Sequence, residues 1–195
     1  MSNATSSAKR DYLTIVSGLP RSGTSMMMRM LSEGGIPPLI DNVRTADEDN
    51  PNGYYEFEPV KKTKQDASWL KQASGMVVKM VYRLLYDLPA GYSYRIVFMK
   101  RKLEEVIKSQ EVMLERHGKA GGASDDEIIA LFKSELARCD EWIGQRANFQ
   151  VLYMDYNELM SSPKPAVQAL DAFLGNMNQD AMLHVVDPKL YRQRK

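Results

Sequence analysis

Cysteine and histidine are scarce in this sequence of 195 residues. The one cysteine, Cys139, falls within a helical pattern and has no second cysteine with which to form an intramolecular disulfide. The two histidines, His117 and His184, stand far apart in the sequence, and no spacing typical of a zinc site is present. We therefore expect neither a disulfide nor a bound metal.

The sequence also lacks an excess of charge of either sign. Its 26 basic and 25 acidic residues leave a formal net charge of +1. No basic and aromatic repeat is visible, so nothing indicates a surface for a polyanion. We expect no nucleic-acid partner.

Long apolar runs are missing as well. No stretch approaches the length of a membrane span, and residues 1–10 are polar and lack the apolar centre of a signal peptide. We expect a cytoplasmic protein without a membrane partner. A hydrophobic content of 44% and a charged content of 26% suit one globular domain. The expected division is a disordered tail over 1–10 and a single domain over 11–195.

Apolar segments and helical patterns alternate along the chain. The segments at about 12–17, 76–80, 94–99 and 149–154 are predicted to be strands. Such alternation predicts an α/β fold with a mostly parallel central sheet flanked by helices on both faces. Ligands of open α/β sheets bind at the carboxyl ends of the strands.

Two of the helices have clear ends in the sequence. Ser124 with Glu127 forms a capping-box pattern for a helix that runs to about Ile143. Ser162 with Pro163 starts another helix, and Gly175 ends it. The stretch 118–123, which holds three glycines, is either a linker or a loop that covers the substrate.

The first predicted strand runs through a glycine-bounded loop into a helix. Gly18 and Gly23 bound this loop, and the helix follows at once. Backbone N–H groups of such a loop and of the helix N-terminus lack intrahelical partners, and the helix dipole adds positive potential. The segment therefore predicts an anion site, with a plain connecting turn as the alternative.

The loop departs from a nucleotide-binding P-loop at one informative position. The residue after Gly23 is Thr24, where an ATP- or GTP-binding loop would have lysine. Arg21 provides a cation inside the loop instead, and its guanidinium can form two parallel hydrogen bonds with an oxyanion.

With this arginine, the run Pro-Arg-Ser-Gly-Thr-Ser at 20–25 resembles the 5′-phosphosulfate loop of the sulfotransferase family. The donor of that family is 3′-phosphoadenosine 5′-phosphosulfate (PAPS). The resemblance implies a P-loop NTPase-like sulfotransferase fold in which the loop holds the donor. The loop residues that it implies as donor ligands are Arg21, Ser22, Gly23, Thr24 and Ser25.

A second segment resembles the site that binds the 3′-phosphate of PAPS in this family. Sulfotransferases have an arginine at the end of a strand and a serine eight residues later, as Arg101 and Ser109 are here. Many members have proline two residues after the arginine, where this chain has Leu103. In a straight helix Ser109 would lie about 10 Å along the axis, so a shared phosphate contact requires the chain to turn first. An ordinary amphipathic helix is the alternative.

Three further features agree less specifically with the family. Lys79 ends a predicted strand where sulfotransferases often have a lysine that reaches the transferring sulfuryl group; with Arg21 it is a predicted catalytic cation. Tyr156 stands where a tyrosine often lies against the adenine, although a core aromatic is as good an interpretation. The basic end at 187–195 supplies more cations or is a frayed tail.

At the position of the proton acceptor the sequence departs from the family. Small-molecule sulfotransferases commonly have a histidine two residues after the lysine, where this chain has Val81. We expect a carboxylate instead, with Glu56 as first choice and Asp41 as second. The segment 50–56 resembles bacterial sulfotransferase-like proteins, although carboxylates of this stretch can also be solvated surface. Tyr54, Tyr55 and Trp69 are predicted to form an aromatic acceptor pocket or part of the core.

The resemblance implies a sulfotransferase that moves a sulfuryl group from PAPS to a hydroxyl or amine of a small-molecule or carbohydrate acceptor, without a metal. A homo-oligomer is possible. The alternatives are a P-loop nucleotide kinase or NTPase, a nucleotide-binding protein without transferase activity, and an interaction module.

Overall fold

The computed structural model describes residues 10–47, 50, 53–116, 118 and 124–187. The expected loop at 119–123 and the basic end at 188–195 lie outside the described residues, as does the expected tail except for Arg10. Arg10 donates a hydrogen bond from Nη2 to the carbonyl of Gly175 at 3.2 Å.

Four parallel strands form the central sheet in the order β2-β1-β3-β4. Their bounds are β1 Leu13–Gly18, β2 Val77–Lys79, β3 Tyr94–Lys100 and β4 Phe149–Asp155. Each lies within two residues of its predicted position, and the predicted α/β fold is confirmed. Because all strands run the same way, their carboxyl ends meet at one edge of the sheet, where Gly18, Lys79 and Lys100 end three of them.

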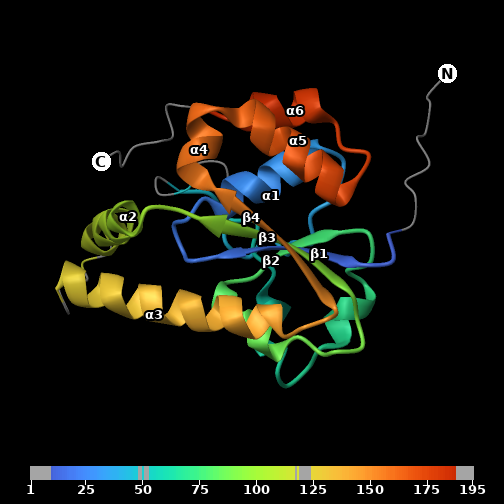
Figure 1. Ribbon diagram of the computed structural model, residues 1–195, viewed down its shortest axis with the longest axis horizontal. Helices are drawn as coiled ribbons and strands as arrows, with labels where there is room; N and C mark the ends of the chain where they lie inside the picture. The colour runs from blue at the N-terminus through green and yellow to red at the C-terminus, as the bar shows by residue number, and fades with distance from the viewer. Residues whose placement is uncertain (1–9, 48–49, 51–52, 117, 119–123, 188–195) are drawn as a thin grey trace.

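Helices cover both faces of this sheet (Figure 1). The helices α1 Thr24–Glu33, α4 Tyr156–Ser161, α5 Pro163–Leu174 and α6 Gln179–Val185 lie on one face. The long helix α3 Asp125–Gly144 lies on the other, together with the 3₁₀ segments Glu58–Lys62, Ser68–Lys71 and Tyr82–Asp87. The helix α2 Leu103–Arg116 packs against α3 beyond the end of β3.

The two faces of the sheet have separate hydrophobic cores. On β1, Ile15 packs in the core beneath α3, and Val16 packs in the core beneath α1, α4, α5 and α6. Both side chains are fully buried. Successive side chains of a strand point to opposite faces, so a strand that is buried along its whole length serves both layers at once.

The predicted helix ends are confirmed by the structure. The Ser124 side chain accepts a hydrogen bond from the Glu127 N–H, and the Glu127 carboxylate accepts one from the Ser124 N–H, which completes the capping box of α3. α5 begins at Pro163 and is followed by Gly175 with φ 74°. Of the helices in the described part of the chain, none has both the length and the apolar character needed to cross a bilayer.

Candidate functional site

The loop between β1 and α1 has a backbone that admits few side chains. Gly18, Arg21 and Gly23 have φ values of 142°, 70° and 95°. A Cβ on Gly18 would lie 2.7 Å from the carbonyl oxygen of Met99, and a Cβ on Gly23 would lie 2.4 Å from Cδ2 of Tyr156. Arg21 is a non-glycine residue in the left-handed region, where backbone strain often accompanies a functional site. Both glycines are therefore fixed by packing as well as by conformation.

Ser22, one of the predicted donor ligands, has its side chain turned away from the cavity. Its hydroxyl donates to the Leu19 carbonyl at 2.7 Å, and its N–H points to the same oxygen at 3.2 Å. The side chain is buried, at 1% exposure. Ser22 therefore closes the turn of the loop, and its hydroxyl is not part of the cavity wall.

A cavity of about 330 Å³ opens over this loop. Arg21, Gly23, Thr24 and Ser25 line it, together with residues from β2, α2, α4 and the segment 44–56. Six basic side chains line it: Arg21, Arg29, Arg44, Lys79, Arg101 and Arg116. Among the described residues, Glu56 is the single acidic side chain in the lining. A chain with almost no net charge thus concentrates positive charge in one hollow, which favours an anionic ligand.

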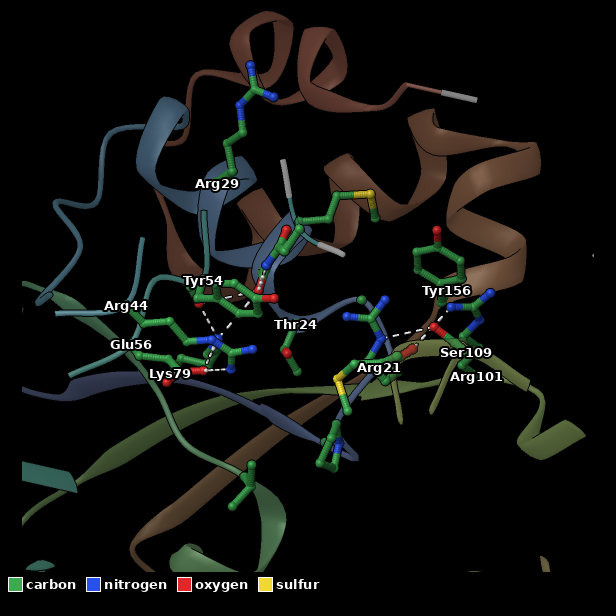
Figure 2. A pocket seen from close by; sticks show the side chains of 18 of the residues that line it. Arg21, Thr24, Arg29, Arg44, Tyr54, Glu56, Lys79, Arg101, Ser109 and Tyr156 are labelled. Atoms are coloured by element: carbon green, nitrogen blue, oxygen red, sulfur yellow. Dashed lines mark hydrogen bonds and ion pairs between the residues drawn. The ribbon is translucent and has the colours of Figure 1, made fainter. Parts of the chain in front are cut away.

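One end of the cavity joins the loop to the two predicted 3′-phosphate ligands (Figure 2). Arg21 donates from Nε to the Ser109 hydroxyl at 2.9 Å, and Arg101 donates from Nη1 to the Arg21 carbonyl at 3.0 Å. Arg101 precedes α2, and its side chain reaches back to the loop while Ser109 lies on the second turn of the helix. The helix begins directly after Arg101, so the expected turn of the chain before the helix is not present; the two side chains nevertheless line the same cavity.

A buried carboxylate holds Arg101 in this position. Glu105 pairs with Arg101 Nε at 2.9 Å, and the two side chains are 0% and 8% exposed. The other oxygen of Glu105 accepts from Asn157 Nδ2 at 2.9 Å. The Arg101 guanidinium carbon lies 4.5 Å from the centroid of the Tyr156 ring, within the range of a cation–π contact. The pair Arg101 and Glu105 has the i,i+4 spacing of a helical ion pair, a signal that the sequence contained.

Lys79 lies at the other end of the cavity. Its ammonium donates to the Tyr54 carbonyl, lies 3.3 Å from the Ser25 hydroxyl and lies 3.8 Å from Oε1 of Glu56. The pKa of Lys79 is lowered to about 8, mainly by burial and to a smaller extent by nearby Arg44, while Glu56 opposes both effects. Thr24 lies between this group and the group around Arg21 in Figure 2.

The segment before the first 3₁₀ helix supplies the residues around Lys79. Arg44 pairs from Nη1 with Oε1 of Glu56 at 3.1 Å, and its guanidinium carbon lies 3.3 Å from the Tyr54 ring centroid. Asn50 donates from Nδ2 to the Ser25 hydroxyl at 2.9 Å. The predicted base Glu56 is therefore in the cavity, with one carboxylate oxygen between two cations.

Asp41, the second predicted base, is not brought into the cavity. Its carboxylate accepts hydrogen bonds from the N–H groups of Glu58 at 2.6 Å and Val43 at 3.0 Å. The bond from Glu58 is the main reason that the pKa of Asp41 lies below its usual value. Asp41 does not line the cavity, so it serves as a local cap of the chain. Of the two predicted bases in the described residues, Glu56 is the one that lines the cavity.

The three residues of the predicted aromatic pocket lie in different parts of the structure. Tyr54 lines the cavity, Tyr55 packs against the core on the α1 face, and Trp69 is buried in the core on the α3 face. Trp69 donates from Nε1 to the Thr63 hydroxyl at 3.1 Å, so its polar atom is satisfied within the core. Tyr156 is also buried, at 5% exposure, and one part of it lines the cavity.

Several residues of the cavity wall were not predicted from the sequence. Arg44 lies in a stretch whose predicted site residues were carboxylates and tyrosines, and Arg29 lies on α1 beyond the loop motif. Val112, Met113 and Arg116 continue the face of α2 that carries Ser109, at the helical spacings of three, four and seven residues. Once Ser109 was assigned to the site, this helical spacing could have predicted that the three residues also line the cavity.

One comparison with solved structures bears on this architecture. No protein family and no curated protein matches the chain. Among solved structures, a sulfotransferase domain from the curacin biosynthetic pathway has a TM-score of 0.55 at 14% identity, over 92% of this chain and 79% of that one. A sugar kinase from Janibacter sp. HTCC2649 has a TM-score of 0.42 at 15% identity, over 91% of this chain and 99% of the kinase. The first likeness shows that the chain has the fold of that sulfotransferase domain.

Proposed function

We propose that this chain is a PAPS-dependent sulfotransferase. The supporting observation is that Arg21, Lys79, Arg101 and Ser109, which lie on separate segments of the sequence, line one cavity with the loop 18–25. In the reaction, an acceptor oxygen or nitrogen forms a bond to the sulfur of the donor while the bond from sulfur to the 5′-phosphate oxygen breaks. The acceptor loses a proton, and 3′-phosphoadenosine 5′-phosphate (PAP) leaves.

The cavity offers groups that suit each part of the donor. The loop N–H groups, the N-terminus of α1 and Arg21 would hold the 5′-phosphosulfate, and Thr24 and Ser25 would add hydroxyl donors. Arg101 and Ser109 would hold the 3′-phosphate. The Tyr156 ring, which already packs on Arg101, would contact the adenine.

Glu105 makes this arrangement rigid before any ligand binds. An arginine that is held at 8% exposure by a buried carboxylate has little rotamer freedom left to lose. The guanidinium is therefore oriented in advance for a phosphate, which favours binding over a flexible surface arginine.

Lys79 is placed to stabilise charge on the transferring group, because its ammonium lies beside the N-terminus of α1 at the Ser25 hydroxyl. Glu56 is the proposed proton acceptor, since it is the single acidic side chain in the described lining. Arg44 and Lys79 both contact Oε1 of Glu56, so Oε2 is the oxygen proposed to accept the proton.

Nothing in the cavity favours a nucleoside-triphosphate kinase. Thr24 occupies the position of the phosphate-binding lysine, and on the proposed assignment Arg101 would hold a 3′-phosphate, which ATP and GTP lack.

The proposal is tested by ligand-induced thermal stabilisation. PAP, ATP, GTP and 5′-AMP are compared with and without magnesium; a ligand at about a hundred times its dissociation constant adds roughly 2.7 kcal/mol. We expect stabilisation by PAP in the absence of magnesium. Stabilisation only by ATP or GTP with magnesium contradicts the proposal, and no response to any of the four also contradicts it.

A further inference from the structure

The edge strand β4 carries none of the sequence features that usually keep a sheet edge from pairing with another chain. It runs for seven residues, Phe149–Asp155, without proline, lysine or glycine. Gln150 and Tyr153 are exposed, and the Tyr153 side chain is 41% open to solvent. Native edges are commonly blunted by short strands, by lysine or proline, or by a covering segment. β4 therefore remains an edge that can accept a further strand.

The opposite edge of the same sheet is protected. β2 has three residues and ends in Lys79. The Val77 N–H donates to the Pro37 carbonyl at 3.0 Å, and the Val77 carbonyl accepts from the Leu39 N–H at 2.8 Å. Within the described residues, by contrast, β4 pairs with β3 alone, and no backbone bond from another segment reaches residues 150–154. The described helices lie above and below β4 in Figure 1, and none is drawn across it.

The bonds between β3 and β4 determine which backbone groups face outward. The Tyr94 N–H donates to the Asn148 carbonyl at 2.9 Å, and Tyr94 lies opposite Phe149 in the register of the two strands. Backbone groups alternate in direction along a strand, so the even-numbered residues of β4 face β3. Val151 and Tyr153 consequently present both their N–H and their C=O to the open side of the sheet.

We propose that this edge joins two copies of the chain, whose β4 strands run antiparallel about a two-fold axis at Leu152. In this register Val151 lies opposite the partner's Tyr153, and the symmetry repeats the pair on the other side of the axis. Each such pair exchanges two hydrogen bonds, so the outward groups of both residues are satisfied. A two-fold contact also closes on itself and uses up the open edge, so it forms a dimer and not a fibre.

The side chains of the proposed register are complementary. Val151 packs against the core on the α3 face. Tyr153 lies on the same face, with its ring centroid 5.7 Å from that of Phe98, and its hydroxyl donates to Asp140 of α3 at 3.0 Å. In the dimer each exposed Tyr153 ring would lie beside the partner's Val151. Pairs of an aromatic and a β-branched side chain are favourable across neighbouring strands.

The charges at the two ends of β4 also favour an antiparallel contact with a second copy. Arg146 precedes the strand and is exposed, Asp155 ends it, and Glu158 follows and is exposed. Antiparallel pairing brings the start of each strand beside the end of the other, so the basic end of one copy meets the acidic end of its partner. A parallel contact would place like charges together.

The test begins with sedimentation velocity of the full chain over a range of micromolar concentrations at pH 7, where we expect a reversible dimer. Val151→Pro removes an outward N–H without removing a bond to β3, a position where an edge strand tolerates proline. We expect this variant to weaken dimerisation about tenfold or more. Val151→Thr is the matched control, since it keeps the N–H and the branched shape, and it should dimerise like the unchanged chain.

Two cysteine variants test the register itself. Leu152→Cys places two thiols across the axis, where the Cα atoms of a non-hydrogen-bonded antiparallel pair lie about 4.5 Å apart, within the range of a disulfide. Gln150→Cys places them about 14 Å apart, which is too far. The native Cys139 is buried at 0% exposure. We expect Leu152→Cys to form a disulfide-linked dimer under mild oxidation and Gln150→Cys to remain unlinked.

The inference is overturned if the unchanged chain is a monomer at every concentration, if Val151→Pro remains a folded dimer, or if the two cysteine variants cross-link alike. Should Val151→Pro fail to fold, which circular dichroism would show, the cysteine pair decides. The inference does not rest on the proposed function, because Gln150, Val151, Leu152 and Tyr153 do not line the cavity. A monomer that binds PAP would therefore refute the dimer and leave the proposed function standing.

Discussion

Glu105→Gln should destabilise the protein strongly although it changes few atoms. The Glu105 carboxylate and the Arg101 guanidinium are 0% and 8% exposed and lie 2.9 Å apart. Glutamine can keep one hydrogen bond, but it leaves the buried arginine without its counter-charge. Breaking a buried ion pair from one side costs about 3–5 kcal/mol, and the retained hydrogen bond places this change near the lower limit.

For a domain of this size, about 3 kcal/mol corresponds to a fall in Tm of roughly 6–12 °C. The assay is urea denaturation or scanning calorimetry at pH 7 without ligand. Glu111→Gln is the matched control on the same helix: Glu111 pairs with Lys108 at 3.1 Å, but the two side chains are 37% and 52% exposed. Because exposed pairs contribute about 0–1 kcal/mol, we expect little change. Equal effects of the two substitutions would refute the view that Arg101 is held by a buried carboxylate.

Three further predictions concern the loop and the other end of the cavity. Lys79 has a pKa of about 8 in the folded chain and 10.5 in the unfolded chain, so between these pH values the unfolded chain binds more protons. The free energy of unfolding of the unchanged chain should therefore rise between pH 8 and pH 10.5 relative to that of Lys79→Met, measured by urea denaturation at several pH values. If the two free energies change in parallel over this range, the prediction is contradicted. Gly23→Ala should abolish PAP binding, measured by calorimetry, because its Cβ would meet Tyr156 at 2.4 Å, whereas Gly75→Ala, with φ 76° and open space, should retain it. Glu56→Gln should bind PAP at least as tightly as the unchanged chain, since a negative charge leaves the cavity, and should lose turnover; weakened PAP binding would show that Glu56 shapes the donor site.

The strands and the helix ends could be predicted from the sequence because their signals are local. The four strands of the sheet were predicted from four apolar segments. The start of α3 was predicted from Ser124 and Glu127, because a capping box depends on two residues three positions apart. The loop with Arg21 was recognisable for the same reason: its glycines, its arginine and the helix that follows are contiguous in the chain.

Glu56 and Tyr54 were predicted near the site, but the neighbouring Arg44 and Asn50 could not be predicted in the same way. The chain between α1 and β2 has only short 3₁₀ segments, so no periodicity shows which side chains face the cavity. Arg44 and Asn50 reach the site through contacts with Tyr54, Glu56 and Ser25, which depend on how this stretch lies over α1.

The roles of Ser22 and Asp41 depend on hydrogen bonds that the sequence motif alone does not reveal. Ser22 lies within the motif, yet its hydroxyl is used by the Leu19 carbonyl, and Asp41 lies in the expected acidic stretch, yet backbone N–H groups occupy its carboxylate. In both cases a short polar side chain bonds to nearby backbone, a competition that residue type and position do not reveal.

The central claim is that this cavity recognises a nucleotide through its 3′-phosphate. The most direct measurement is titration calorimetry of PAP and of 5′-AMP, which differ only in that phosphate, on the unchanged chain and on Arg101→Met without magnesium. The account predicts that the unchanged chain binds PAP about a hundredfold more tightly than 5′-AMP and that Arg101→Met removes most of this preference. Equal affinity of the unchanged chain for the two nucleotides would contradict it.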